Sequence, residues 1–366
     1  MVIAKKVLTY RKKHSILYPL KASKRQSIKA LKCKSEGFYR GGNGMKIKKI
    51  FIGMLVLTMV ISIFTACGKE EKAIKIGVNQ LVRHGALDAS YIGFVDALKD
   101  AGYIDGENII IDYQIAHNDQ SIVNTIATKL VNDGSDLILA ISTPSAQAVA
   151  NATKDIPVLV TAVTDPAESG LVKSNEVPGG NVSGTSDLTP VKKQIELLTQ
   201  LVPGVETIAV LYSSSESNSK IQVEMAIEAA EEYNLEVVEA TVSNTNEIEQ
   251  VVQSLVGKVD AIYAPTDNTI ASGMPTVAMV ANSNGIPIIC GEESMVDSGG
   301  LATYGIDYYK LGRLTGEQAV RILEEKATTD TMPIEYLPDD EYTLKINKEV
   351  AGQLGITIPE ELTNNN

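Results

Sequence analysis

Two stretches of this sequence place small polar residues directly after short apolar runs, a pattern suited to holding a small polar ligand. In residues 136–166, one apolar run ends at Ser142-Thr143-Pro144 and the next ends at Thr164-Asp165-Pro166. The same order returns in residues 260–294, where Pro265-Thr266-Asp267 takes the place of Ser142-Thr143-Pro144. Short apolar runs joined by helical pieces are typical of parallel strands with crossover helices. Two such units predict two similar lobes with facing polar rims.

The two units differ in the chemistry they offer. The turn Thr143-Pro144-Ser145 opens a helix, whose free N–H groups and dipole suit a carboxylate. Asp267 and Glu292, in the second unit, could hold an ammonium group, although Glu292 could equally be a solvated loop acid. Donors on one lobe and acids on the other would close around an amino acid.

Helix capping is the competing explanation for the acidic residues. Asp165-Pro166 followed by Glu168 fits a capping box, so Asp165 is either a cap or a ligand contact. For Asp267 we favour the ligand, because Asn268 or Thr269 could cap the following helix instead. Ligands of open parallel sheets lie outside the carboxyl ends of the strands. The strand-end candidates are Asn79, Gln80, Ser142, Thr143, Ser145, Thr164 and Asp165 in the first lobe, and Ser213, Ser214, Thr266, Asp267, Asn268, Gly291 and Glu292 in the second.

Other reactive residue types give little sign of chemistry. His84 and His117 have no partner at metal-ligand spacing, and we expect both to be surface or loop residues. Tyr212 and Tyr304 could supply stacking faces. The sequence contains no GxSxG, HExxH, P-loop or glycine-rich dinucleotide motif, so neither an enzyme nor a cofactor is predicted. Cys290, in an apolar run, is expected to be a small buried side chain.

The elements that position these residues alternate between strand and helix. In the first lobe, strands are expected at 74–78, 108–113, 137–141 and 158–163, with helices at 88–101 and 121–131. In the second, strands are expected at 207–212, 236–241, 260–264 and 286–290, with helices at 220–233, 247–256 and 270–282. The predicted fold class is α/β, with two doubly wound parallel-sheet lobes joined by a three-stranded hinge.

Turn-rich stretches mark the expected passages between the lobes. They are 178–187, with a short extended piece at 182–185, then 299–305, and a third from Met332-Pro333. The helix 308–325 should pack back on the first lobe. The resulting division is 74–186 plus 306–328 for lobe one and 187–305 plus 329–360 for lobe two, with residues 360–366 expected to fray.

Charge and hydropathy separate the N-terminal 66 residues from the rest. The chain has 366 residues and a net charge of −12; residues 1–66 hold 15 Lys/Arg and one Glu, which leaves 18 basic and 44 acidic residues in 67–366. Residues 67–366 are therefore so acidic that they would repel nucleic acid, which is disfavoured as a partner. Residues 45–66 have the basic start and apolar core of a signal peptide, and Phe64-Thr65-Ala66-Cys67 resembles a lipobox, with Cys67 as the lipidated residue; a plain signal anchor is the alternative.

Two further segments border the signal peptide. Residues 1–44 precede a complete signal peptide that begins at Met45, so we interpret them as a mis-started, disordered leader. Residues 67–73 are interpreted as a tether to the membrane.

Several ordered strings resemble one family. VNQLVRHGALD, STPSAQA, TAVTDP, GNVSGTSD, APTDNTI and GGLATYGIDYYKLG are similar to the tryptophan/tyrosine-type substrate-binding lipoproteins of ABC transporters, over about residues 73–354. The resemblance implies a type I periplasmic-binding-protein fold with three inter-lobe crossings and a cleft for an aromatic amino acid or a similar solute. By motif, it places ligand contacts at Gln80, Thr143, Ser145, Gln147, Thr164, Asp187, Asp267 and Asn268.

The function predicted from these observations is solute binding outside the cytoplasm. A lipid-anchored protein would close its lobes around a small solute, such as an aromatic or other amino acid, and deliver it to an ABC permease. The alternative is a ligand-sensing subunit of the same fold that signals to a membrane receptor. A transcriptional regulator would need a DNA-binding segment where this chain has its signal peptide.

Overall fold

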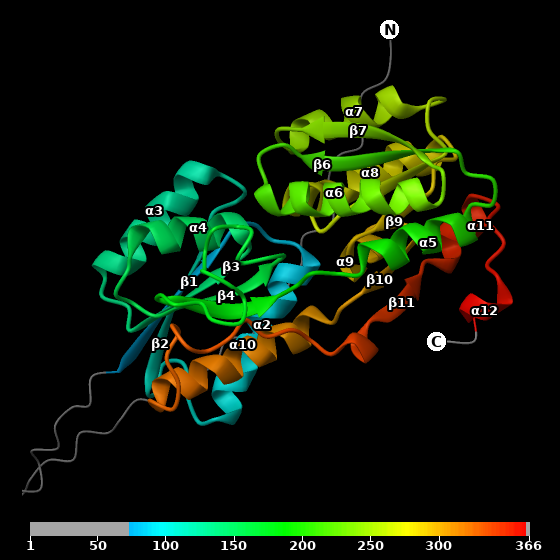
Figure 1. The fold of residues 1–366 in the computed structure, drawn as a ribbon. Coiled ribbons are helices and arrows are strands. Elements are labelled where there is room, and N and C mark those ends of the chain that lie inside the picture. The colour runs from blue at the N-terminus through cyan, green and yellow to red at the C-terminus, as the bar shows by residue number, and fades with distance from the viewer. Residues whose placement is uncertain (1–72, 364–366) are drawn as a thin grey trace, which may run out of the picture. The chain divides into compact units, whose positions relative to one another are not determined.

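The computed structural model describes residues 73–363, which belong to one compact unit. The leader, the signal peptide, Cys67 and all but the last residue of the tether lie outside the described residues. Within the described part, no helix combines the length and the hydropathy needed to cross a bilayer. Strands and helices form two lobes, each with its own sheet and apolar core (Figure 1).

Lobe one is built on a parallel five-stranded sheet of order β2-β1-β3-β4-β5. Its elements are β1 (Ile74–Gln80), α2 (Gly85–Asp100), β2 (Ile109–Ile115), α3 (Gln120–Asn132), β3 (Leu137–Ile141), α4 (Thr143–Ala152), β4 (Val158–Val163), β5 (Val182–Ser186) and α10 (Tyr308–Leu323).

Lobe two repeats this order in its sheet β11-β10-β9-β8-β6-β7, in which only β11 is antiparallel to its neighbour. Its elements are α5 (Val191–Leu201), β6 (Thr207–Ser213), α6 (Ser217–Glu232), β7 (Glu236–Val242), η1 (Thr245–Glu247), α7 (Ile248–Leu255), β8 (Ala261–Ala264), α8 (Asn268–Ser283), β9 (Ile288–Cys290), α9 (Glu293–Asp297), β10 (Ala302–Gly305), η2 (Asp339–Glu341), β11 (Thr343–Ile346), α11 (Lys348–Gln353) and α12 (Glu360–Thr363). The predicted α/β class with two parallel-sheet lobes is confirmed.

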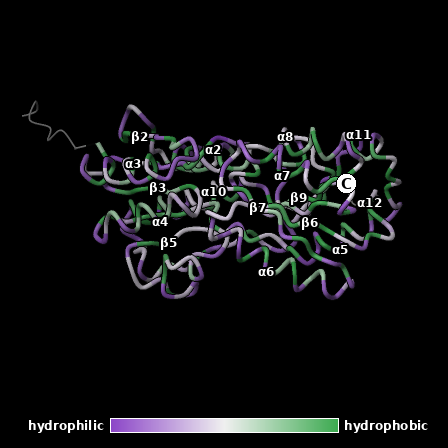
Figure 2. The backbone as a smooth tube through the Cα atoms, turned by 90° about the horizontal axis from the view of Figure 1, so that it is seen from above, coloured by the Kyte–Doolittle hydropathy of each residue, from purple (hydrophilic) through white to green (hydrophobic). Residues whose placement is uncertain are grey.

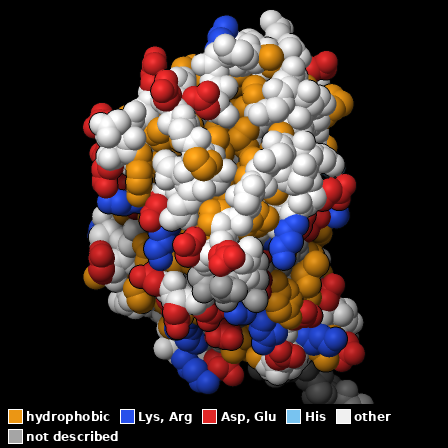
Figure 3. Space-filling view, turned by 90° about the vertical axis from the view of Figure 1, so that its right-hand side faces the viewer, with side chains coloured by type: hydrophobic (Ala, Val, Ile, Leu, Met, Phe, Trp, Pro, Cys, Tyr) orange, Lys and Arg blue, Asp and Glu red, His pale blue; other side chains and the backbone are white. Residues whose placement is uncertain are grey.

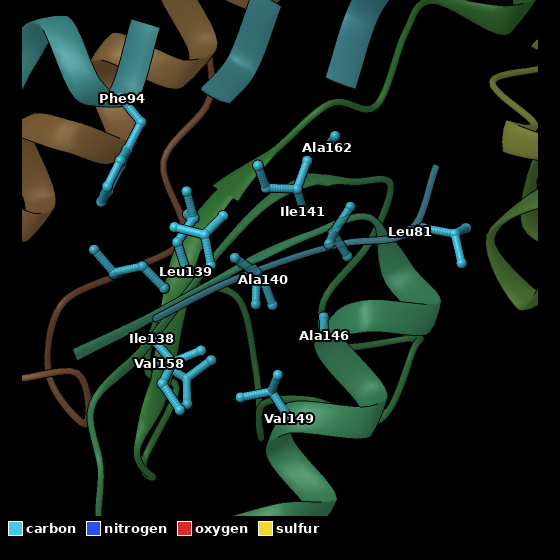
Figure 4. Close-up of a cluster of buried hydrophobic side chains, with 14 of the residues drawn as sticks. Leu81, Phe94, Ile138, Leu139, Ala140, Ile141, Ala146, Val149, Val158 and Ala162 are labelled. Carbon is cyan, nitrogen blue, oxygen red and sulfur yellow. The ribbon is translucent and has the colours of Figure 1, made fainter. Parts of the chain in front are cut away.

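The central strands of lobe one are apolar on both sides because helices cover both faces of the sheet. Every residue of β3 and β4 is buried. Side chains of β3 alternate between Phe94 of α2 on one side and Ala146 and Val149 of α4 on the other (Figure 4). Hydrophobic segments follow the interior of the unit, and hydrophilic residues gather at the peripheral turns (Figure 2). Cys290 is buried as a free thiol, as expected.

Helix α10 packs back on lobe one, as the sequence predicts, and lies there against α2 (Figure 1). The contact is so close that a Cβ at Gly93 would lie 2.0 Å from the Tyr309 carbonyl oxygen, and one at Gly312 would lie 2.0 Å from the Ser90 carbonyl oxygen. Only glycine permits this approach of the two helix backbones. Lobe one is therefore completed by a helix that follows most of lobe two in the chain.

The chain crosses between the lobes three times. The segment 182–185, expected in the first passage, belongs to β5, and the chain crosses after it, before α5. Residues 302–305, expected in the second passage, form β10 of lobe two, so that crossing lies between β10 and α10. The third crossing follows Glu335, because Glu335 N–H still donates to the Gly184 carbonyl of lobe one (3.0 Å).

The C-terminal segment is more ordered than expected. Residues 360–363 form α12, in which Leu362 is buried against the core of lobe two, so the predicted fraying is wrong for them. Residues 364–366 lie outside the described part. Acidic and basic side chains are interspersed on the face shown in Figure 3, without a continuous basic patch there of the kind that binds nucleic acid.

Candidate functional site

A closed cleft lies where the carboxyl ends of the two sheets face each other. It is lined by His84, Leu87, Ala162, Thr164, Asp187, Asn218, Thr266, Asp267, Asn268, Ala271, Glu292 and Tyr308. The volume open to the centre of a water-sized sphere is about 10 Å³, roughly the space of one water. The lobes are therefore shut on each other in this structure.

Hydrogen bonds between the lobes hold the cleft closed. His84 Nε2 lies 3.3 Å from Asn268 Oδ1, and Asn118 Nδ2 donates to Thr269 Oγ1 at 3.0 Å. Gln222 Nε2 donates to Thr164 Oγ1 at 3.2 Å. Each of these bonds pairs one residue of lobe one with one of lobe two.

The N-terminus of α4 carries three buried hydroxyl groups without a partner. They are Ser142 Oγ, Thr143 Oγ1 and Ser145 Oγ, and Ser142, the N-cap residue, makes no side-chain capping bond. Ser142 also has a φ of 93°, a conformation that non-glycine residues adopt at a cost. Buried hydroxyls normally have partners. Beside the free N–H groups and positive dipole of a helix N-terminus, this arrangement is suited to a carboxylate.

Asp187 lies on the first crossing and faces the cleft. Its side chain is buried; Tyr308, at the second crossing, donates its hydroxyl to Oδ2 at 2.7 Å, and Oδ1 has no partner. Burial raises the pKa of Asp187 to about 6, an effect that the Tyr308 hydrogen bond partly opposes. A carboxylate with one unused oxygen in a desolvated cleft is suited to an ammonium group.

Asp267 lines the cleft, but its oxygens are already occupied. Oδ1 accepts from Ile270 N–H (2.8 Å), and Oδ2 accepts from Ser213 N–H and Ser219 Oγ (2.6 Å each). Asp267 is thus the N-cap of α8, and the expectation that Asn268 or Thr269 would cap this helix is wrong. Burial, followed by repulsion from Glu216, raises the pKa of Asp267 to about 7.

Glu216 is a buried acid that the sequence did not single out. Its Oε1 accepts from Thr269 N–H and Oγ1 (2.9 Å each), and its Oε2 accepts from Asn268 N–H (3.2 Å) and Nδ2 (2.5 Å). The first turn of α8 is therefore bound by two carboxylates. Glu216 follows two serines after β6, where an acid looks like an ordinary loop residue, and its partners lie more than fifty residues away in the chain.

Glu292 is a buried cap rather than a solvated loop acid. It precedes α9 and accepts from Ser294 N–H (2.5 Å) and Ser294 Oγ (2.7 Å). Burial raises the pKa of Glu292 to about 7. Among the residues that line the cleft there are three carboxyl groups and neither Lys nor Arg. This imbalance favours a ligand with a cationic group.

The predicted contacts Gln80, Thr143, Ser145 and Gln147 are not among the residues that line the cleft. Gln80 donates to Asp88 Oδ1 at 2.7 Å and accepts from the Tyr113 hydroxyl at 2.8 Å. Gln147 bridges the lobes by donating to Ser217 Oγ at 3.3 Å.

Asp165 belongs to a turn. Its carboxylate accepts from Ala167 N–H (2.9 Å), Glu168 N–H (3.1 Å) and Asn175 Nδ2 (3.0 Å). Of the two predicted roles, cap or ligand contact, these bonds support the cap. It is not one of the residues that line the cleft.

Aromatic and histidine side chains are arranged differently from the prediction. His84 lies in the loop before α2, as predicted, but its side chain also lines the cleft, as does that of Tyr308. Tyr212 instead donates to Glu239 at 2.6 Å, and Tyr304 lines a separate cavity of about 200 Å³. His84 ends the loop between β1 and α2, and a loop that follows a strand end was a signal that could have marked it as a candidate.

The comparisons with known proteins agree with this geometry. Residues 75–366 match the family model described as ABC transporter substrate binding protein. The chain is 49% identical over 324 residues to a tyrosine-binding protein from Clostridioides difficile (strain R20291), covering 85% of this chain and 93% of that protein.

Two solved structures are similar along most of their length. One is an ABC domain from Streptococcus pneumoniae in complex with L-Trp, at 45% identity and a TM-score of 0.77, covering 80% of this chain and 98% of that one. The other is a ligand-free, open substrate-binding protein with adhesive properties from Clostridium difficile, at 50% identity and a TM-score of 0.61, covering 79% and 97%.

Proposed function

This chain belongs to the ABC transporter substrate-binding protein family, and from that premise we propose that it binds an aromatic amino acid between its lobes for import. The family consists of solute-binding proteins that act outside the cytoplasm, not enzymes. The observation that carries the ligand assignment is a set of unpartnered buried polar atoms in two chemically distinct places. These are the hydroxyls at the start of α4 and Oδ1 of Asp187.

The two places match the two charges of a free amino acid. The α4 N-terminus would accept the ligand carboxylate through N–H groups and the Thr143 and Ser145 hydroxyls. Asp187 would accept the ammonium group. Asp267 and Glu292, predicted as the ammonium partners, would instead hold α8 and α9 in place, since each is bonded to the helix that it caps.

The aromatic class is proposed from the relatives and from the cleft walls. One relative is a tyrosine-binding protein and one solved structure contains L-Trp. Between the polar groups, the cleft is lined by the small or apolar side chains of Leu87, Ala162 and Ala271. The higher TM-score to the L-Trp complex than to the open, ligand-free protein supports interpreting this conformation as the closed form.

Import requires attachment to the membrane and an ABC permease that receives the ligand. We propose that Cys67 carries a lipid that holds the protein at the outer face of the cell membrane, and that the closed form docks on an ABC permease. Membrane fractionation of a Cys67→Ser variant measures the lipid attachment. A ligand sensor of the same fold remains the second candidate, and uptake of labelled amino acid in cells that lack the protein separates the two.

A binding titration of the purified full chain tests the ligand class. L-tyrosine and L-tryptophan should bind, and at 100 times its dissociation constant either one should stabilise the protein by about 2.7 kcal/mol. L-glutamate and myo-inositol serve as matched negative ligands. Stabilisation by these but not by aromatic amino acids would contradict the proposed class.

A further inference from the structure

A chain of contacts crosses the cleft from Glu216 through Asn268 to His84. Asn268 Nδ2 donates to Glu216 Oε2 at 2.5 Å. Because a carboxylate can only accept, this bond fixes which end of the Asn268 amide is nitrogen and which is oxygen. The oxygen, Oδ1, then faces His84 Nε2 at 3.3 Å.

This orientation determines the tautomer of His84. An amide oxygen cannot donate, so Nε2 must carry the proton of the contact. In a neutral imidazole the other nitrogen, Nδ1, then has a lone pair and no proton. Burial lowers the pKa of His84 to about 4, which keeps the ring neutral at physiological pH.

Nδ1 is therefore an acceptor with nothing to accept. It is buried, it has no hydrogen-bond partner, and its side chain lines the cleft. An unpaired polar atom in a desolvated place costs stability unless a partner arrives. A hydrogen-bond donor on a bound ligand would satisfy this atom.

The ammonium group of an amino acid is not the best match for this atom. The cleft already offers that cation the unused oxygen Oδ1 of Asp187, which can carry a full negative charge. Charged donors form stronger hydrogen bonds with charged acceptors. A neutral imidazole nitrogen is suited to a neutral donor, such as a phenol hydroxyl or an indole N–H.

We propose that His84 is a specificity-determining residue whose Nδ1 accepts a hydrogen bond from the polar group on the ligand's aromatic ring. This inference rests on the proposed function and deepens it: the preferred ligands are aromatic amino acids with a ring donor, and phenylalanine is discriminated against. Glu216 acts as a positioning residue, through Asn268.

The recognition is linked to closure. His84 belongs to lobe one, whereas Asn268 and Glu216 belong to lobe two. The proton is held on Nε2 by this contact only when the lobes meet. A ring donor on Nδ1 and an acceptor at Nε2 stabilise the same tautomer, so each favours the other.

Two pairs of ligands test the proposal on the unmodified full chain by calorimetry. L-tyrosine differs from L-phenylalanine by one hydroxyl, and L-tryptophan differs from 1-methyl-L-tryptophan by the loss of the indole N–H. A site built around a ring donor rejects the analogue that lacks it, so each first member should bind at least about tenfold more tightly. Equal affinity for tyrosine and phenylalanine would overturn the role of His84 and leave the proposed function standing. Absence of binding by all four compounds would overturn both.

Variants then assign the discrimination to His84. His84→Leu should bring the tyrosine-to-phenylalanine affinity ratio close to one, mainly by weakening tyrosine. His84→Asn is the matched control, because its amide oxygen can reach the position of Nδ1, and it should retain part of the preference. Glu216→Gln should lower the ratio, since a glutamine side chain no longer fixes the Asn268 amide. An unchanged ratio in His84→Leu would refute the proposal.

Discussion

Helices α4 and α8 occupy equivalent positions in the two lobes, yet their N-termini are satisfied in opposite ways. Each follows the third strand of the doubly wound order, β3 in lobe one and β8 in lobe two. The first turn of α8 is bound by the carboxylates of Asp267 and Glu216. The first turn of α4 has no side-chain cap and keeps three unpartnered buried hydroxyls.

This difference shows how a duplicated βαβ unit can divide two tasks. The α8 end is neutralised from within the chain, so it provides a rigid wall and repels a further anion. The α4 end is left open, at a cost in stability that a bound carboxylate would offset. Three substitutions test whether lobe two uses its carboxylates for stability and lobe one leaves its polar groups free for the ligand.

The largest expected effect is on stability, in lobe two. Asp267→Ala removes a helix cap and leaves the Ser213 N–H and Ser219 hydroxyl buried without their acceptor, so the ligand-free protein should lose about 4 kcal/mol. Urea unfolding of the full chain measures the loss. If Asp267 served only as a ligand contact, as the sequence suggested, stability would be unchanged, and that result would remove the distinction between the two helices.

The next effect is a pH dependence of stability that arises from Asp187, the carboxyl group on the first crossing whose Oδ1 has no partner. The pKa of Asp187 is about 6 in the folded protein and near 3.8 in an ordinary environment. The folded state thus binds the proton more tightly, and the stability from protonated Asp187 is full below pH 4 and is lost as the pH rises through 6. Asp187→Asn removes this contribution.

Unfolding of the ligand-free wild type and of Asp187→Asn at several pH values measures it. The wild type should lose stability relative to the variant between pH 4 and pH 7, by up to about 3 kcal/mol. Asp267 and Glu292 are present in both proteins, so their own titrations largely cancel. Parallel curves would mean that Asp187 is not perturbed.

The smallest effect is on binding alone, in lobe one. Ser145→Ala removes a hydroxyl that has no partner in the ligand-free chain, so stability should change by less than about 0.5 kcal/mol. Affinity for L-tyrosine should fall about tenfold, because a hydrogen bond to a carboxylate is lost. Ser219→Ala, at the acceptor Asp267, is the matched control and should show the reverse pattern. Loss of stability without loss of affinity in Ser145→Ala would place the ligand carboxylate elsewhere.

The fold was largely readable from the sequence because local signals and burial agree. Strands β3 and β4 have the predicted bounds, since each apolar run ends at small polar residues followed by proline. The resemblance to ABC substrate-binding proteins is confirmed by the family match. Strand β5 was predicted only as a short extended piece of an inter-lobe passage, because the stretch 178–187 around it is rich in turn formers. It pairs with β4 because Gly184, at a φ of 144°, lets the Val160 carbonyl approach to within 2.1 Å of where a Cβ would stand.

The site was harder to predict from the sequence, because whether a polar side chain is free for a ligand depends on partners that are distant in the sequence. Asp267 looked free until Ser213 and Ser219, some fifty residues earlier, were found to occupy it. His84 looked like a lone surface or loop histidine, and only the folded structure shows that this loop residue lines the cleft. The sequence shows which polar residues follow the strands, and therefore which residues surround the cleft. Only the folded chain shows which of their atoms remain unused.

The return of α10 to lobe one also governs the order in which the molecule can fold. The core of lobe one lacks a helix until Leu323 has been synthesised, and the sheet of lobe two lacks its edge strand until Ile346. Neither lobe can complete itself from an N-terminal fragment, so long-range closure must wait for nearly the whole chain.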